Sequence, residues 1–350
     1  MKEKRYMSLQ KHSKVIISGG GTGGHIFPAI SIANALRKID PEIEILFVGA
    51  EGRMEMEKIP AAGYRIIGLP VAGIYRSLTL KNFKVLIKLF KSLRMAKKVI
   101  REFDPDVVVG VGGYASGPVL RQAGRMKIPT LIQEQNSYAG VTNKLLAKRA
   151  VAICVAYDGM DKYFPSEKII KTGNPVRHNY DNLKDLKEEA LSYFNLKKDF
   201  PVILVIGGSL GAGSINNSLS ENINTLRDSD CQWLWQTGKY YFENVNALVS
   251  VSFSENISVH GFINRMDYAY AAADIILSRA GAGTISELCL VGKPVILIPS
   301  PNVSEDHQTR NAKALSDTDA AVLLTDTQAA TPLTDAAIKL IRERKKREKV

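Results

Sequence analysis

Three glycine-rich segments are the residues of this sequence best suited to chemistry, and the chemistry that they suit is phosphate binding. Five of the six residues in 19–24 are glycine, and further glycine-rich segments occupy residues 110–118 and 207–213. We call these segments the first, second and third loop. Glycines let the backbone approach a phosphate closely, and the start of a helix adds free N–H groups. Two loops in one half of the chain and one in the other predict two phosphorylated ligands.

The first loop also fits a dinucleotide-binding pattern. Gly19, Gly21 and Gly24 satisfy G-x-G-x-x-G, which in NAD enzymes is accompanied by an acid about 20 residues further on, at the end of the next strand. Glu51 is the nearby candidate, but it follows Gly49 in a predicted loop. An NAD-dependent dehydrogenase is therefore a distant alternative, and a tight turn without a ligand is another.

The loops must be positioned by strands and helices, and the sequence predicts both. Short β-branched runs alternate with amphipathic stretches, which is typical of βα units around a parallel sheet. Continuous apolar runs such as PVILVIGG fit strands that are covered on both faces. The predicted strands are residues 14–18, 44–48, 64–67, 106–110, 130–133 and 151–156 in the first half, and 201–206, 232–236, 257–260, 275–278, 295–299 and 321–324 in the second.

The chain divides into two predicted domains, residues 1–173 and 174–350. A turn signal, GNPVR, begins at Gly173, and a polar stretch follows it. Each half is long enough to bury its own core. Both halves open with an apolar strand, a glycine turn and a helix, so the sequence predicts an α/β fold of two doubly wound, Rossmann-like domains that face each other across a cleft. Ligands in such domains bind beyond the carboxyl ends of the strands.

The charge is concentrated in the first domain. The whole chain has a net charge of +12, whereas residues 1–173 hold 28 Lys and Arg against 14 Asp and Glu, and the remainder holds 19 against 21. A basic half indicates a polyanionic partner, either nucleic acid or an anionic membrane surface. Nucleic acid is disfavoured because no aromatic stacking set or reading helix accompanies the charge.

Residues 74–101 are the predicted membrane contact. Positions 76–101 contain nine Lys and Arg and no acid. Apolar residues recur there at helical spacing, as in a basic helix that lies in a membrane interface. The alternative is a helix that packs its apolar stripe on the sheet, and a mixture of the two is the favoured interpretation. The stripe is Leu86, Leu89, Phe90, Leu93, Ala96 and Ile100, and the residues expected to meet lipid are Ile74, Leu78, Leu80 and Phe83.

Several classes of protein are excluded. No apolar run approaches the roughly 20 residues of a spanning helix, and the charged N-terminus lacks the apolar core of a signal peptide. Cys154, Cys231 and Cys289 have no metal-binding or disulfide spacing, so we expect buried thiols in a reducing cytosol. No metal site is predicted.

Seven motifs follow one another in the order GGGTGGHIFPAI, VGGYASGPV, EQNSYAGVTNKLLAK, GNPVR, GGSLGAGSIN, SRAGAGTISEL and EDHQTRNA. Over residues 14–325 the chain therefore resembles the MurG family of glycosyltransferases, glycosyltransferase family 28. The resemblance implies a GT-B fold and a hexosyltransferase of peptidoglycan synthesis, a process that serves cell shape and division. The implied reaction moves GlcNAc, with inversion, from UDP-GlcNAc to the MurNAc 4-hydroxyl of undecaprenyl-pyrophosphoryl-MurNAc-pentapeptide (lipid I), which gives lipid II. It also implies a peripheral location on the cytoplasmic face of the cell inner membrane, without a cofactor.

The resemblance assigns the loops to two substrates. The acceptor pyrophosphate would meet Gly21, Gly112, Gly113, Tyr114, Ser116 and Gly117. The start of the first helix would lie beside both substrates, and Arg177 would be a charge partner of the UDP diphosphate. Ile263 would contact uracil through its backbone, Glu287 the ribose hydroxyls, and Asn136 and Gln308 the sugar. The UDP-GlcNAc residues are Thr22, Gly23, Gly24, Asn136, Arg177, Ser209, Ile263, Ala282, Gly283, Thr284, Ile285, Ser286, Glu287 and Gln308.

An inverting transfer requires a base, because the acceptor hydroxyl loses its proton as it attacks the anomeric carbon. His25 is the first candidate, since imidazole exchanges protons near neutral pH and a helix N-terminus favours its neutral form. A second interpretation is that His25 only positions the acceptor or the loop. Glu134, at the end of a predicted strand, is either the alternative base or a structural carboxylate.

Two other functions stay open at this stage. One is a soluble enzyme that resembles UDP-GlcNAc 2-epimerase, which leaves the second phosphate loop and the basic segment without a role. The other is a non-catalytic peripheral membrane protein that binds a nucleotide sugar. Release of UDP in the presence of a lipid I analogue separates this last function from a transferase.

Overall fold

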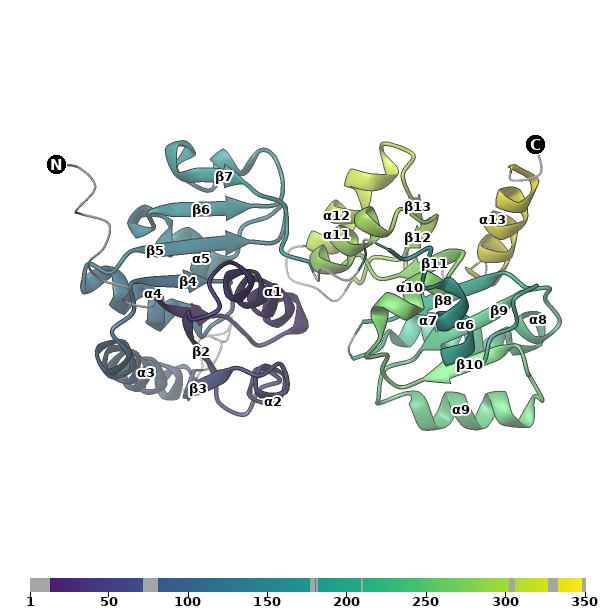
Figure 1. The fold of residues 1–350 in the computed structure, drawn as a ribbon, viewed down its shortest axis with the longest axis horizontal. Coiled ribbons are helices and arrows are strands. Elements are labelled where there is room, and N and C mark those ends of the chain that lie inside the picture. Colours follow the sequence, from purple (N-terminus) through teal and green to yellow (C-terminus); the bar gives the residue numbers. More distant parts are fainter. Residues whose placement is uncertain are drawn as a thin grey trace. The chain divides into compact units, whose positions relative to one another are not determined.

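The computed structural model describes residues 13–71, 81–176, 180, 182–208, 210–301, 306–326 and 333–347. The chain forms two compact units, residues 1–176 and 177–350, each built on its own sheet (Figure 1). The side chains of residues 81–84, 86 and 344–347 are not described. Of the residues predicted to meet lipid, Ile74, Leu78 and Leu80 therefore lie outside the described residues, as does the side chain of Phe83.

The first unit contains a parallel sheet with the strand order β3-β2-β1-β4-β5-β6-β7. From β1 the chain runs outward to β3, and it then returns to β4 on the other side of β1. The strand order therefore reverses between β1 and β4, which is where doubly wound sheets bind ligands. The strands are β1 (Lys14–Ser18), β2 (Glu44–Ala50), β3 (Arg65–Leu69), β4 (Val107–Gly110), β5 (Thr130–Glu134), β6 (Ala152–Val155) and β7 (Ile169–Lys171).

Helices cover both faces of this sheet, and successive residues of β1 such as Ile16 and Ile17 are both fully buried. Burial on both faces is the reason that these strands read as continuous apolar runs. The helices are α1 (Gly23–Ile39), α2 (Glu55–Ala61), α3 (Lys81–Phe103), α4 (Ser116–Arg125) and α5 (Val141–Leu146), with 3₁₀ turns at Ala147–Arg149, Met160–Lys162 and Ser166–Lys168.

The second unit repeats the arrangement with the order β10-β9-β8-β11-β12-β13, which reverses between β8 and β11. Its strands are β8 (Val202–Ile206), β9 (Gln232–Gln236), β10 (Ile257–His260), β11 (Ile275–Ser278), β12 (Val295–Leu297) and β13 (Val322–Leu323). Its helices are α6 (Lys187–Tyr193), α7 (Gly213–Glu221), α8 (Ile223–Arg227), α9 (Phe242–Val251), α10 (Met266–Ala272), α11 (Ala282–Val291), α12 (His307–Ser316) and α13 (Leu333–Arg347).

Twelve predicted strands are present, with ends that differ by at most a few residues. Strand β7 was not predicted, because its three residues are too few to establish a period and Ile170 is exposed. The expectation for the cysteines was wrong in part. Cys231 is buried, Cys154 is half-buried and Cys289 is exposed on α11. Desolvation still raises the pKa of the Cys154 and Cys289 thiols, which favours their neutral form.

The predicted apolar stripe of α3 is divided between packing and exposure. Ala96 and Ile100 are buried, together with Val99, whereas Leu89 and Phe90 are exposed. The C-terminal part of α3 packs against α4, since the Gln122 amide donates to the Leu93 carbonyl oxygen at 3.1 Å. No helix in the described part of the chain is both long enough and apolar enough to cross a membrane.

Candidate functional site

The first and second loops are in direct backbone contact. A Cβ on Gly113 would lie 2.3 Å from the carbonyl oxygen of Gly20, and Gly113 has a φ of +82°. A Cβ on Gly112 would lie 2.8 Å from the Cε1 atom of His25. Only glycine fits these two positions, because any side chain would separate the loops or displace the imidazole. The second loop therefore supports both the first loop and the ring of His25.

A buried carboxylate ties the first loop to the sheet. Glu55, at the start of α2, is 1% exposed and accepts two backbone N–H bonds, from Gly21 at 3.0 Å and from Ala50 at 2.9 Å. Glu55 was not predicted from the sequence, because an acid in the first turn of a short helix usually faces solvent. Its position also means that the N–H of Gly21, expected at the acceptor pyrophosphate, is engaged within the protein.

The helices α1 and α4 begin at the first and second loops, which we call the interlocked loops. At the start of α1, the N–H groups of Gly23 and Gly24 have no acceptor among the described residues, and neither an acid in the first turn nor the Thr22 side chain caps the helix. At the start of α4, Ser116 is fully buried and its hydroxyl donates to the Gly113 carbonyl oxygen at 2.9 Å. Uncapped N–H groups and the positive end of a helix dipole suit an anion such as a phosphate.

The remaining residues of the second loop surround this helix start. Tyr114 is exposed, and Gly117 is the second residue of α4. The structure therefore brings together most of the residues predicted for the acceptor pyrophosphate. These are Gly112, Gly113, Tyr114, Ser116 and Gly117, beside Thr22, Gly23 and Gly24 of the first loop.

His25 is half-buried and is held by one side chain. Its Nδ1 lies 3.1 Å from Oε1 of Gln135, which stands in the loop directly after β5. The Gln135 amide in turn donates to the carbonyl oxygen of Val111, in the second loop, at 2.9 Å. Gln135 lies within the EQNSYAGVTNKLLAK motif, but no role was predicted for it from the sequence. The only signal for it was its place at a strand end, next to Glu134.

Glu134 is a fully engaged carboxylate. It is 2% exposed, and its oxygens accept four bonds, from the N–H and the amide of Asn136 and from Gly140 N–H and the Asn143 amide at 2.9 Å each. These bonds fix the loop that carries Gln135 and Asn136. Because these donors occupy its lone pairs, the carboxylate has little capacity left to accept a substrate proton.

In the second unit, the third loop is packed against the end of β9. A Cβ on Gly211, whose φ is +82°, would lie 2.1 Å from the Thr237 carbonyl oxygen, and the Gln236 amide donates to the Gly208 carbonyl oxygen at 2.9 Å. The loop leads into α7, so this unit also has a glycine turn before a helix. Ser209 and Arg177, two of the predicted donor-binding residues, lie outside the described residues.

Helix α11 begins at Ala282, as the sequence predicted, directly beyond β11. Gly281 caps it in an extended conformation, and the first turn contains no acid. Gly283, Thr284, Ile285 and Ser286 form this turn, and the Ser286 hydroxyl donates to the Ala282 carbonyl oxygen. Glu287 is half-buried and accepts the Tyr270 hydroxyl at 3.1 Å.

The other two predicted donor residues differ in their surroundings. Ile263 is buried in the core, so only its backbone could serve a ligand. Gln308, on α12, accepts the Ser300 N–H at 2.9 Å through Oε1. This bond orients the amide, and its Nε2 has no partner in the described part of the chain, which leaves it able to donate to a sugar hydroxyl.

No cluster of three His, Cys, Asp or Glu side chains able to hold a metal ion occurs within the ranges that the structure describes.

The family is shown by comparison with known proteins. The glycosyltransferase family 28 N-terminal domain matches residues 15–155, and the glycosyltransferase family 28 C-terminal domain matches residues 202–350. The chain belongs to glycosyltransferase family 28. A family 28 relative from Parabacteroides distasonis is 57% identical over 330 residues, which are 94% of this chain and 90% of the relative. It is named UDP-N-acetylglucosamine--N-acetylmuramyl-(pentapeptide) pyrophosphoryl-undecaprenol N-acetylglucosamine transferase.

Solved structures agree with the family assignment. Acinetobacter baumannii MurG has a TM-score of 0.68 and 27% identity, covering 95% of this chain and 99% of its own. The fold of the chain is thus GT-B, with two Rossmann-like α/β domains. A UDP-GlcNAc 2-epimerase from Neisseria meningitidis has a TM-score of 0.63 at 17% identity, covering 96% of this chain and 93% of its own. That likeness shows a shared fold alone.

The role of Glu55 can be tested with Glu55→Gln. One of the two N–H donors that face the carboxylate then meets an amide NH₂, so we expect the free energy of unfolding to fall by about 1–3 kcal/mol. Urea denaturation measures the change. Glu57→Gln, an exposed acid on the same helix, is the matched control and should change stability by less than about 0.5 kcal/mol. Equal stability of the two variants would remove Glu55 as the tie.

Proposed function

We propose that this chain transfers GlcNAc from UDP-GlcNAc to the MurNAc 4-hydroxyl of lipid I and thereby forms lipid II for peptidoglycan. The observation that carries the proposal is the high identity, over nearly the whole chain, to family 28 relatives that are named for this transfer. The interlocked loops support it, because they offer an anion site next to an imidazole. The epimerase alternative has only a shared fold in its favour.

For the donor, we propose that UDP binds at the carboxyl ends of β8 and β11. The start of α11 supports this assignment, since its first turn contains no acid and no side chain caps it. Glu287 would accept the ribose hydroxyls, and the Gln308 amide would donate to the sugar. We retain Ser209 and Arg177 as diphosphate contacts and Ile263 as the uracil contact.

For the acceptor, we propose that the lipid pyrophosphate binds at the starts of α1 and α4. The N–H groups of Gly23 and Gly24 support this, and so does the exposed ring of Tyr114 at the edge of the site. The lipid pyrophosphate would then lie beside His25, whose ring the second loop supports. Asn136, in the loop that Glu134 organises, would bond the transferred sugar.

The proposed reaction is a single displacement. The imidazole of His25 takes the proton of the MurNAc 4-hydroxyl while that oxygen bonds to the anomeric carbon. The bond from this carbon to the UDP oxygen breaks, and the configuration inverts. His25 is favoured over Glu134 as the base because every bond of the Glu134 carboxylate is used to hold its own loop.

We expect His25→Ala to lower kcat at least about tenfold, since it removes the base, while the affinity for UDP-GlcNAc stays nearly unchanged. Initial rates of UDP release with a lipid I analogue, together with donor binding by calorimetry, measure both quantities. Glu134→Gln, tested beside it, should act mainly by loosening its loop and lowering the stability. Near-normal turnover of His25→Ala would eliminate His25 as the base.

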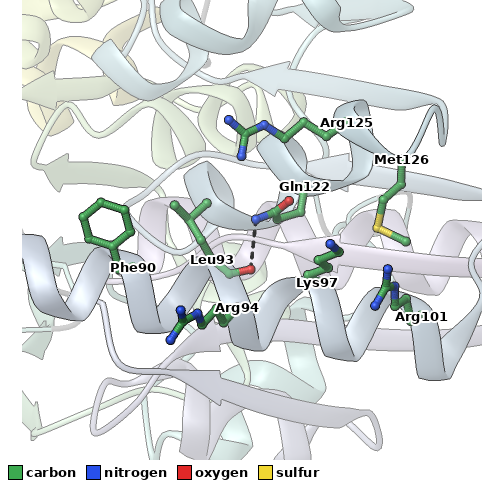
Figure 2. A pocket seen from close by; sticks show the side chains of 8 residues that line it. All are labelled: Phe90, Leu93, Arg94, Lys97, Arg101, Gln122, Arg125 and Met126. Carbon is green, nitrogen blue, oxygen red and sulfur yellow. Dashed lines mark hydrogen bonds between the residues drawn. The ribbon is translucent and has the colours of Figure 1, made fainter.

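A basic cavity supports the proposed contact with an anionic membrane. It lies between α3 and α4, with a volume of about 470 Å³ (Figure 2). Four cationic side chains and no acid line it, and exposed Phe90 stands at its edge. Cations beside an exposed aromatic ring suit a surface of anionic lipid headgroups. The cavity residues are Phe90, Leu93, Arg94, Lys97, Arg101, Gln122, Arg125 and Met126. We propose that this face of the first unit lies on the cytoplasmic leaflet of the inner membrane.

Vesicle flotation tests the membrane contact. We expect the double variant Arg94→Gln and Lys97→Gln to bind vesicles of phosphatidylcholine with phosphatidylglycerol about thirtyfold less tightly, as about 1 kcal/mol for each charge implies. The matched control, Lys339→Gln with Arg342→Gln on α13, removes the same charge from the other unit and should bind normally. Equal loss in both variants, or equal binding to pure phosphatidylcholine, would contradict a specific basic face.

A further inference from the structure

A series of hydrogen-bonded side-chain amides connects Asn174, in the segment that follows β7, to His25. The Gln133 amide donates to Oδ1 of Asn174 at 3.1 Å. Oε1 of Gln133 accepts from Nε2 of Gln135, and Oε1 of Gln135 faces Nδ1 of His25 at 3.1 Å. Gln133 and Gln135 are each 2% exposed. Water therefore has little access to replace these bonds, and a missing partner would leave a buried polar group unsatisfied.

Two backbone carbonyl oxygens fix the direction of this series, that is, which neighbour the oxygen and the NH₂ of each amide face. A carbonyl oxygen only accepts hydrogen bonds, so the side-chain atom that faces it must be the NH₂ of an amide. The Val111 carbonyl oxygen thus sets the orientation of Gln135 at 2.9 Å, and the Gln135 carbonyl oxygen sets that of Asn174 at 3.0 Å. Once Asn174 presents its oxygen to Gln133, the Gln133 amide must point its own oxygen at Gln135. The carbonyl oxygens at both ends of the series impose the same direction.

This direction determines which atom of Gln135 meets the imidazole. With its NH₂ committed to Val111 and Gln133, Gln135 can present only its oxygen to His25. An amide oxygen cannot donate, so Nδ1 of His25 must carry a proton. A neutral imidazole has one N–H, and its proton is therefore on Nδ1. The lone pair is left on Nε2, which has no hydrogen-bond partner among the described residues.

We propose that Gln135 is a positioning residue that holds neutral His25 in the Nδ1–H tautomer, so that Nε2 is the atom that takes the acceptor proton. The function of this tautomer rests on the proposed transfer, with His25 as the base. The same bond persists when Nε2 becomes protonated, because Nδ1–H still donates to Gln135. Gln133 and Asn174 act indirectly. Their hydrogen bonds prevent the side-chain amide of Gln135 from flipping, which would exchange the positions of its oxygen and NH₂.

The tautomer itself can be measured without substrate, which separates this proposal from the proposed function. In the full chain labelled with ¹⁵N-histidine, long-range ¹H–¹⁵N spectra distinguish a protonated ring nitrogen from an unprotonated one. The spectrum of His25→Ala assigns the signals. We expect a protonated Nδ1 and an unprotonated Nε2 for neutral His25. A proton on Nε2 in the wild type would overturn the proposal, whatever the variants do.

A matched pair of variants tests whether the oxygen of Gln135 is the cause. Gln135→Met and Gln135→Glu both lose the bonds to Val111 and Gln133, but only glutamate keeps an oxygen that faces Nδ1. In the methionine variant, we expect neutral His25 to be no longer held in the Nδ1–H tautomer. We also expect kcat to fall at least about tenfold, with KM for UDP-GlcNAc within about twofold of normal. The glutamate variant should keep the Nδ1–H tautomer at a pH where the ring is neutral and retain more turnover than the methionine variant.

The control is Gln232→Met, which removes another buried amide that donates to backbone carbonyl oxygens, in the second unit. It should leave the His25 signals and kcat unchanged. If both Gln135 variants lose activity equally and the His25 tautomer does not change, Gln135 only supports the loop and the proposal fails. If the tautomer follows the prediction but His25→Ala is active, the tautomer assignment stands and the proposed role of His25 as the base fails.

Discussion

The backbone contact between the first and second loops is the constraint on which the candidate site depends. Gly113 and Gly20 touch main chain to main chain at the carboxyl ends of β1 and β4, and no side chain fits between them. This contact places the starts of α1 and α4 at one edge of the sheet, and it lets Gly112 pack against the ring of His25. Buried Glu55 also ties the first loop to β2, because it accepts the N–H groups of Gly21 and Ala50.

The polar groups around this edge divide into supports and reactants. Two buried carboxylates are supports: Glu55 accepts two backbone N–H bonds, and Glu134 accepts four bonds from backbone and amide donors. The link between Glu134's loop and His25 is made of neutral amides, which avoids the large desolvation cost of a further buried charge. The imidazole of His25 keeps Nε2 without a partner among the described residues. The residue proposed to react, His25, is therefore distinct from the side chains that hold the loops in place.

Much of the fold followed from local pattern. Strands buried on both faces read as apolar runs, and glycine turns before amphipathic stretches indicated the doubly wound units. Short elements such as β7 carry too few residues to establish a period. For the stripe of α3 the favoured prediction was a mixture of packed and exposed positions, and in the structure Ala96 and Ile100 are buried while Leu89 and Phe90 are exposed.

The sequence by itself determined which residues could serve phosphate, since glycine at a strand end and an uncapped helix start have the same properties wherever they lie. It also determined the family, through motifs that are contiguous in the chain. Only the tertiary structure decided which side chains these loops use as partners. Glu55 binds Gly21 across 34 residues, and Gln135 meets His25 across 110. A parallel sheet brings the ends of distant strands to one edge, and hydrogen bonds made there depend on direction and distance in space, which neither composition nor spacing records.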